Sequence, residues 1–352
     1  MALLLVLGPR VLPEYRDPAA VRLDLVSAAM SVVAVLTVIY GLKEIAQGGL
    51  SGIPVLSILA GLAVGLVFVR RQRTLADPMI DVALFRIAAF NAALATNFLA
   101  IFVAVGYFLF VAQYLQLVVG LSPLEAGLWS LPSAVGFIAG SQLGPRIVQQ
   151  VRPAFVIGGG LALSAVGLAL LTQVDAAGSL VALVAGSVII SLGLAPVFGL
   201  TTELIVGSAP PERAGAASGI SETGAELGGA LGIAILGSIG VAIYRGELAG
   251  RLPPDVPPEA AALASDTLGS AVAVAGELPD QLGAAVLEAA REAFVNGMQL
   301  SSAIAAMVAV GLAVLALVVL RDRPASSFEA DADAQLDTTA AACGGQLKAA
   351  DG

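Results

Sequence analysis

The chain alternates between long apolar stretches and short polar segments that carry charge, proline or glycine. An α-helix rises 1.5 Å per residue, so about 20 apolar residues cross the hydrocarbon core of a bilayer. The stretches long enough to do so lie at about 24–41, 53–69, 90–117, 125–145, 154–172, 180–205, 213–244 and 297–320. This pattern predicts an all-α, polytopic membrane protein with eight spans.

The polar segments divide the chain into five predicted parts. A run of apolar residues at the start is too short for a span and is typical of the truncated end of a transmembrane helix. Segment 70–87 is basic and then amphipathic, which favours a short helix at the cytoplasmic interface, with an ordinary polar loop as the alternative. The predicted parts are 1–22 (helix end and cytoplasmic linker), 23–69 (two central helices), 70–89 (amphipathic linker), 90–320 (six-helix bundle with an extracytoplasmic loop at 245–296) and 321–352 (disordered cytoplasmic tail).

Composition excludes a water-soluble globule. Hydrophobic residues make up 58% of the chain and charged residues only 12%, and the mean hydropathy is +0.94. So little polar surface requires a bilayer as solvent. The net charge of −9 arises from the outer loop and the tail, so the chain has no basic patch for nucleic acid.

The basic residues also predict the orientation. Most of the 17 Lys and Arg residues fall on one side of the membrane if the segment before the first full helix is cytoplasmic. Cytoplasmic loops carry an excess of positive charge, so we expect both ends of the chain in the cytoplasm.

The inventory of reactive side chains argues against an enzyme. The sequence contains no histidine and a single cysteine, Cys343. A His-based triad and a His-ligated metal are therefore excluded, and no nucleophile with a base or phosphate-binding loop is visible. We expect neither a metal site nor a cofactor.

The most informative stretch is GISETGAELGGALG, which starts at Gly219 inside the seventh predicted helix. It places Glu222 and Glu226 one turn apart on one helix face, at membrane depth. Their Cβ atoms should lie about 5–6 Å apart, where two charges repel by about 3 kcal/mol at an effective dielectric of ~20. Such a pair is suited to exchange a proton for an organic cation. In the alternative, each carboxyl only hydrogen-bonds a neighbouring helix as packing.

Glycines on the same helix fall into two groups. Those near the carboxylate face are expected to clear space for a ligand: Gly215, Gly219 and Gly229. The others form a small-residue stripe that favours close helix packing: Gly224, Gly228 and Gly232.

Helix 90–117 carries an unusual density of hydrogen-bonding side chains for a span, and a tryptophan follows in the next helix. Aromatic faces and amides suit a lipophilic cation. Interface anchoring by Tyr and Trp explains the same residues equally well. The candidates for lining a substrate cavity are Asn97, Tyr107, Gln113, Tyr114, Gln116 and Trp129.

Two prolines and one further glutamate are expected to shape their helices. Pro132 and Pro196 should kink their helices, which serves either gating or packing. In the run SPLEAG, Ser122 and Glu125 are spaced as a capping box, which we favour over a catalytic role for the glutamate.

Three runs together resemble a known family: FVAQYLQLVVGLSPLEAGLWSLPSAVG, APPERAGAASGISETGAELGGALGIAILGS and AFVNGMQLSSAI. They are similar to the fourteen-helix drug:proton antiporter branch of the major facilitator superfamily, of QacA, SmvA and EmrB type. The resemblance implies the C-terminal six-helix bundle plus two central linker helices, with the N-terminal bundle absent. In QacA-like proteins a pair of acids occupies the positions of Glu222 and Glu226, and the second is aspartate.

The resemblance also implies a function. We expect a multidrug efflux transporter in the bacterial plasma membrane that exports hydrophobic or cationic drugs, antiseptics or antibiotics. The energy source would be proton antiport, with Glu222 and Glu226 as coupling and cation-binding residues. The expected partners are the lipid bilayer, drug substrates, protons and a missing N-terminal half. The alternative is a non-transporting half that assembles with or regulates a full transporter.

Overall fold

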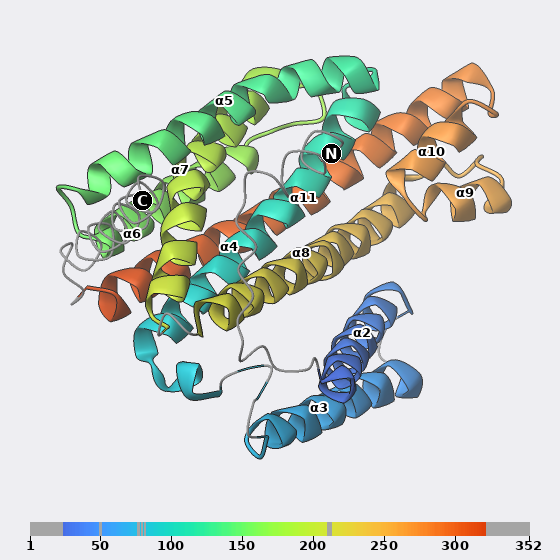
Figure 1. The fold of residues 1–352 in the computed structure, drawn as a ribbon. Helices are drawn as coiled ribbons and strands as arrows, with labels where there is room; N and C mark the ends of the chain where they lie inside the picture. The colour runs from blue at the N-terminus through green and yellow to red at the C-terminus, as the bar shows by residue number, and fades with distance from the viewer. Residues whose placement is uncertain are drawn as a thin grey trace, which may run out of the picture.

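The fold is known from a computed structural model that describes residues 24–48, 51–75, 78, 80, 82–209 and 213–321. Every regular element among these residues is helical (Figure 1). The predictions for 1–22 and for the tail after Arg321 lie outside the described residues. The expectation of an all-helical membrane fold is confirmed.

Each predicted apolar stretch forms a helix, and several of the helices are longer than expected. The long helices are α2 (Leu25–Gly48), α3 (Gly52–Gln72), α4 (Ala88–Gln113), α5 (Pro123–Val148), α6 (Pro153–Leu171), α7 (Leu180–Gly207), α8 (Ala214–Arg251) and α11 (Asp280–Val319). Four short helices complete the described part: η1 (Val82–Arg86), the π-helix η2 (Tyr114–Val118), α9 (Pro258–Ala264) and α10 (Leu268–Ala275).

Seven of the described helices, rather than the eight predicted, are long and apolar enough to cross a membrane. The exception is α5, in which several serines, glycines and two internal prolines lower the hydropathy. One face of α5 is nevertheless an exposed apolar stripe that suits lipid: Leu124, Leu128, Leu131, Val135 and Ile138. An eighth crossing stays a prediction.

Six of the long helices form one bundle (Figure 1). Helix α4 contacts α7, α8 and α11, while α5 and α6 pack against α7. Small residues permit these approaches, because a Cβ on Gly160 of α6 would lie only 2.5 Å from the carbonyl oxygen of Gly193 on α7. The capping box of α5 is present as predicted, with Ser122 Oγ accepting from the Glu125 amide.

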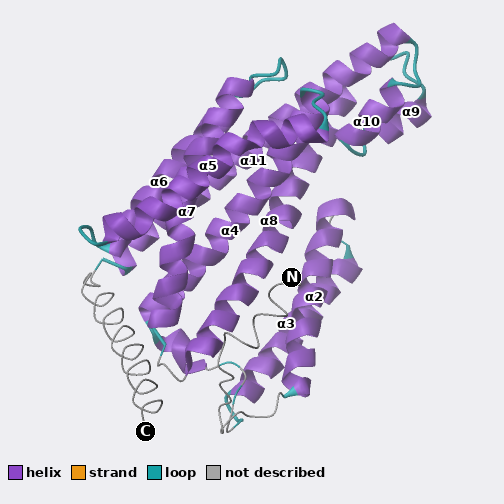
Figure 2. Cartoon of the chain, turned by 45° about the horizontal axis from the view of Figure 1, so that its top comes forward, coloured by secondary structure: helices purple, strands orange, loops and turns teal. Residues whose placement is uncertain are grey.

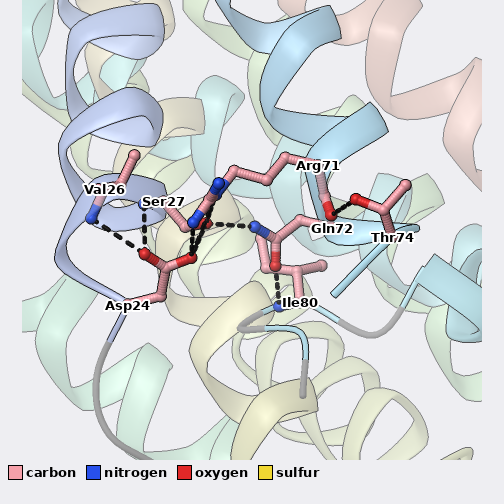
Figure 3. A network of polar contacts seen from close by, with 7 residues as sticks. All are labelled: Asp24, Val26, Ser27, Arg71, Gln72, Thr74 and Ile80. Atoms are coloured by element: carbon pink, nitrogen blue, oxygen red, sulfur yellow. Dashed lines mark hydrogen bonds and ion pairs between the residues drawn. The ribbon is translucent and has the colours of Figure 1, made fainter. Parts of the chain in front are cut away.

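Helices α2 and α3 form a separate hairpin that lies beside α8, where α2 makes the contact (Figure 2). A polar network closes the base of the hairpin (Figure 3). Arg71 of α3 donates from Nη2 to Asp24 Oδ2 at 2.9 Å. Gln72 Nε2 donates to Ser27 Oγ at 2.8 Å, and both of these side chains are buried.

The linker after this hairpin begins within α3, which continues to Gln72, and α4 starts at Ala88. Between them, the described residues contain one short helix, the five-residue η1. The amide of Ile80 donates to Gln72 Oε1 at 3.2 Å, so the linker is tied back to the hairpin base (Figure 3).

The predicted outer loop 245–296 is largely helical. It contains the end of α8, both α9 and α10, and the start of α11. The Ala-rich residues after Pro279 have a high helix propensity, so α11 begins well before the apolar stretch at 297. Arg251 at the end of α8 ties this helix to α11 through an ion pair to Glu292 at 2.5 Å, and it also pairs with Glu247 of α8 itself at 2.8 Å.

Candidate functional site

Helix α8 carries both predicted carboxylates and is held against α4 by glycines. A Cβ on Gly228 would lie 2.4 Å from the carbonyl oxygen of Phe98, and one on Gly232 would lie 2.3 Å from that of Phe102. No side chain fits there without separating the helices. The predicted packing stripe is therefore confirmed at these two positions.

The other glycine group behaves differently. Added Cβ atoms at Gly215 and Gly219 would meet nothing within 4 Å, as expected for a face that leaves open space. Gly229 departs from this expectation, because its Cβ would contact Val105 at 3.4 Å.

A cavity with a volume of about 200 Å³ opens beside the first carboxylate, between α4, α7 and α8. Its walls mix apolar and hydrogen-bonding side chains, and among the described residues that line it Glu222 alone is charged. The lining residues are Asn97, Ile101, Phe198, Thr202, Ser218, Ser221, Glu222 and Ala225.

One hydrogen bond joins two walls of this cavity. Asn97 Nδ2 on α4 donates to Ser221 Oγ on α8 at 3.2 Å, and both side chains are buried. The bond fixes the amide beside the residue that precedes Glu222. Asn97 and Glu222, predicted from separate parts of the sequence, thus meet at one cavity.

The two carboxylates have different surroundings. Glu222 is exposed and, within the described residues, its carboxylate makes no ion pair or hydrogen bond, so it is available to a ligand. Glu226 is also exposed but is not among the residues that line the cavity. Its role in binding or coupling stays a prediction.

Tyr107 and Trp129 line a second, much smaller cavity of about 10 Å³ between α4, α5 and α7. Tyr107 is only 3% exposed, and its hydroxyl makes no hydrogen bond within the described structure; the nearby Ser191 hydroxyl is not in hydrogen-bonding geometry with it. This cavity shares no lining residue with the first. The predicted aromatic residues are therefore not brought to Glu222.

The remaining polar candidates of this region line neither cavity. Tyr114 is fully buried, and its hydroxyl donates to the carbonyl oxygen of Asp175 at 2.7 Å. Gln116 of η2 donates to the carbonyl oxygen of Ala112 near the end of α4, and Gln113 is half-buried. The contacts of Tyr114 and Gln116 support η2, which continues from the C-terminal end of α4.

Both predicted kink residues lie inside uninterrupted helices, Pro132 in α5 and Pro196 in α7. Pro196 also packs against α5, since a Cβ on Gly144 would lie 2.9 Å from its Cβ. A role for these prolines in gating stays a prediction.

Sequence reasoning missed several residues of the larger cavity. Ser218 and Ala225 lie four residues before and three after Glu222, so helical periodicity gave a signal for them. Thr202 and Phe198 are on α7, and their approach to Glu222 depends on how α7 and α8 pack. No local pattern in the sequence indicates that contact.

Comparison with known proteins gives consistent matches. The sequence model of the Major Facilitator Superfamily matches residues 22–233. The multidrug efflux pump LfrA of Mycolicibacterium smegmatis is 37% identical over 90% of this chain and 63% of its own length. The methyl viologen resistance protein SmvA of Salmonella typhimurium is 35% identical over 85% of this chain and 61% of its own.

A third relative, the tetracenomycin C resistance and export protein of Streptomyces glaucescens, is 30% identical over 91% of this chain and 61% of its own length. The chain thus spans a little under two thirds of these relatives. The family match covers more than half of the chain, and the described helices are long and apolar enough for several membrane crossings. This chain therefore belongs to the Major Facilitator Superfamily and is a multi-pass membrane protein.

Proposed function

We propose that this chain is the C-terminal portion of a fourteen-helix drug:proton antiporter that exports hydrophobic or cationic drugs, antiseptics or antibiotics. Relatives with the names of efflux and resistance proteins support drug export. Family membership favours a transporter over an enzyme. In this proposal the bundle of α4 to α8 and α11 is the C-terminal half, and α2 and α3 are the two central helices.

The observation that carries the proposal is an unpaired carboxylate in a cavity of about 200 Å³. Glu222 supplies the negative charge, Asn97 supplies an amide, and Phe198 and Ile101 supply apolar wall. Ionisable groups at membrane depth are costly, and those that face a cavity commonly mark ion or substrate pathways. A proton and a drug cation would compete for Glu222, and Glu226 one turn along would couple the exchange.

The proposal requires a second half. Alternating access in this kind of transporter is a rocking of two bundles around a central site. We place Glu222 on the face that meets an N-terminal bundle, with both ends of the chain in the cytoplasm of a bacterium. The proton gradient serves as the energy source, and no cofactor is needed.

Drug-induced proton release tests this function. The purified chain, reconstituted together with the N-terminal part of a relative, should release protons when ethidium is added. Glu222→Gln should abolish the release and Glu226→Gln should reduce it, because neither amide exchanges a proton. Glu125→Gln is the matched control, since glutamine also serves in a capping box. Unchanged release in both site variants removes the pair from the mechanism.

The second candidate is a non-transporting module that assembles with or regulates a complete transporter. The observation that favours it is the apolar surface of the α2–α3 hairpin, where Leu36 is 60% exposed and Leu62 is 59% exposed, a surface that suits another protein as well as lipid. Expression of the chain alone in a drug-sensitive bacterium separates the candidates. Resistance from the chain alone contradicts the module.

A further inference from the structure

One face of α3 carries exposed leucines and ends in two arginines. The side of α3 that packs against α2 holds the buried residues Pro54, Gly61, Phe68 and Gln72. At about 100° per residue, the opposite side carries three leucines that are 59%, 59% and 54% exposed, followed by the two arginines. We call this surface the leucine–arginine stripe: Leu59, Leu62, Leu66, Arg70 and Arg73.

The two arginines of the leucine–arginine stripe differ from the arginine between them. Arg71 turns toward α2 and pairs with Asp24 at 2.9 Å (Figure 3). Among the described residues, neither Arg70 nor Arg73 has a partner for its guanidinium group in an ion pair or hydrogen bond. Arg73 keeps helical backbone angles, so the Cβ atoms of the two lie about 5–6 Å apart on one helix face. Two unpaired positive charges therefore lie side by side at the end of an apolar surface.

The leucine–arginine stripe has the length of one leaflet of a bilayer. An α-helix rises about 1.5 Å per residue, so Arg70 lies about 16 Å along the axis from Leu59. This distance is close to half of the ~30 Å hydrocarbon core. When the leucines lie among acyl chains, the two guanidinium groups therefore reach the level of the lipid phosphates, where long basic side chains place their charge.

We propose that the leucine–arginine stripe binds one anionic phospholipid. The acyl chains lie along the leucines, and the phosphate oxygens accept hydrogen bonds from Arg70 and Arg73. Guanidinium groups donate paired N–H bonds to phosphate, and such charge-assisted bonds are among the stronger ones in proteins. A zwitterionic lipid carries the same phosphate, but its own ammonium group offsets the charge that attracts it. An anionic head group has no such compensation and is preferred.

Charge complementarity favours a lipid over a protein at this face. An anionic phospholipid combines a negative group and an apolar chain of one leaflet's length in a single molecule, whereas a protein partner would have to present both at the same spacing. The bound lipid would also hold the end of α3 from which the chain continues to α4.

Quenching of a tryptophan by lipids with brominated acyl chains tests this binding, because the quencher acts only at short range. Trp129 is the only tryptophan of the sequence. Trp129→Phe removes it, and Leu62→Trp then places a single reporter on the leucine–arginine stripe. The chain is reconstituted in equal amounts of phosphatidylglycerol and phosphatidylcholine, with bromine on one lipid or the other. Phosphatidylglycerol should be favoured at the reporter by about 10-fold or more, since each arginine adds to the attraction of an anionic lipid.

Arginine variants show whether the two guanidinium groups cause this preference. Arg70→Gln with Arg73→Gln should bring the two lipids within about 2-fold of each other. The matched control is Arg86→Gln with Arg146→Gln, which removes the same charge from two arginines outside the leucine–arginine stripe and should leave the preference intact. All four side chains are exposed, so the fold should tolerate these changes.

A second reporter shows whether the preference is local. Asp24 and Arg71 mark one level of the hairpin, because they form an ion pair. Leu62 lies nine residues from Arg71, and Val33 of α2 lies nine residues from Asp24, so the two positions have a similar depth. Val33 is 51% exposed. Val33→Trp in the Trp129→Phe background should therefore report contact with both lipids and no preference.

The remaining outcomes overturn the proposal. Equal contact with the two lipids at the Leu62→Trp reporter means that the leucine–arginine stripe does not select a head group. A preference that survives the loss of Arg70 and Arg73, or that is equal at Val33→Trp, means that the whole membrane surface of the chain attracts anionic lipid. A Leu62→Trp reporter that neither lipid quenches means that protein, such as a second copy of the chain, covers this face.

Discussion

Two buried tyrosines, Tyr107 on α4 and Tyr114 at the start of η2, differ in whether their hydroxyl groups have a hydrogen-bond partner. The hydroxyl of Tyr114 donates to the carbonyl oxygen of Asp175, whereas that of Tyr107 makes no hydrogen bond within the described structure. Tyr114→Phe should therefore lower the free energy of unfolding by about 1 kcal/mol, and Tyr107→Phe should leave it unchanged or raise it slightly. Unfolding of the purified chain by SDS in mixed micelles measures both values.

Each substitution is the control for the other, because each removes one oxygen from a nearly inaccessible ring and the two residues are only seven positions apart. Equal losses in both variants would show that Tyr107 has a partner, such as a water in the small cavity it shares with Ser187. A loss at Tyr114 alone supports the contacts described here.

For single residues, the sequence was sufficient to predict part of the candidate site. Glu222 was predicted because a carboxylate inside an apolar helix is costly and usually has a function. Asn97 was predicted because its helix carries an unusual density of hydrogen-bonding side chains for a membrane span. The structure places both at one cavity. Tyr107 and Trp129 were chosen by residue type alone, and residue type does not fix which of two cavities a side chain faces.

At the level of helices, the α4–α8 contact gives a sharp prediction. Gly232→Ala would place a Cβ within 2.3 Å of the Phe102 carbonyl oxygen, so the helices must separate, at a cost of about 1–3 kcal/mol. Gly219→Ala on the same helix meets open space and should be neutral or stabilise by about 0.4–1 kcal/mol through the unfolded chain. SDS unfolding of the two variants reports the difference.

Gly219→Ala serves here as the control for helix propensity, since both changes replace glycine by alanine inside α8. If the two variants unfold alike, α4 and α8 do not pack through the glycine stripe. The stripe was visible in the sequence because small residues recur every four positions. The stripe packs on the backbone of α4 around Phe98 and Phe102. This partner was not predictable, because a backbone contact does not depend on the residue type at that position.

The ends of helices were predicted where they depend on neighbouring residues and missed where they do not. The capping box at Ser122 was predicted because it depends on residues three positions apart. The early start of α11 was missed because the expected span boundary followed apolar character, whereas the Ala-rich residues after Pro279, which include several charged side chains, also belong to the helix. Hydropathy locates the membrane-crossing part of a helix but not the helix itself.

For the whole molecule, the pattern of apolar stretches predicted the helical class and the order of the long helices, because bilayer thickness sets their length. The pattern does not say which helices touch. The contact between α2 and α8 joins helices that are far apart in the chain. The closed base of the α2–α3 hairpin depends on polar pairs that are 44 to 47 residues apart. Such pairs were not distinguishable from ordinary interfacial charges.

The network at the hairpin base predicts a pH dependence for the molecule. Hydrogen bonds from Ser27 and Arg71 lower the pKa of Asp24 from its ordinary value of 3.8 to about 2. Because the folded pKa is depressed, the stabilisation is fully present above pH 3.8 and is lost as the pH falls through about 2. Asp24→Asn removes the charge at every pH. The melting temperature of the native chain should therefore exceed that of Asp24→Asn above pH 4, and the gap should close near pH 2.

The comparison isolates one carboxylate, because all other acids titrate in both proteins and cancel in the difference. Asp266→Asn is the control for loss of an ion pair, since Asp266 is 66% exposed and its pair with Arg245 should contribute little. The base of the hairpin also holds the linker through Gln72 and Ile80. A gap between the native chain and Asp24→Asn that is the same at pH 7 and pH 2 would mean that the network does not depend on the Asp24 charge. The hairpin would then be held by packing of α2 on α3 alone.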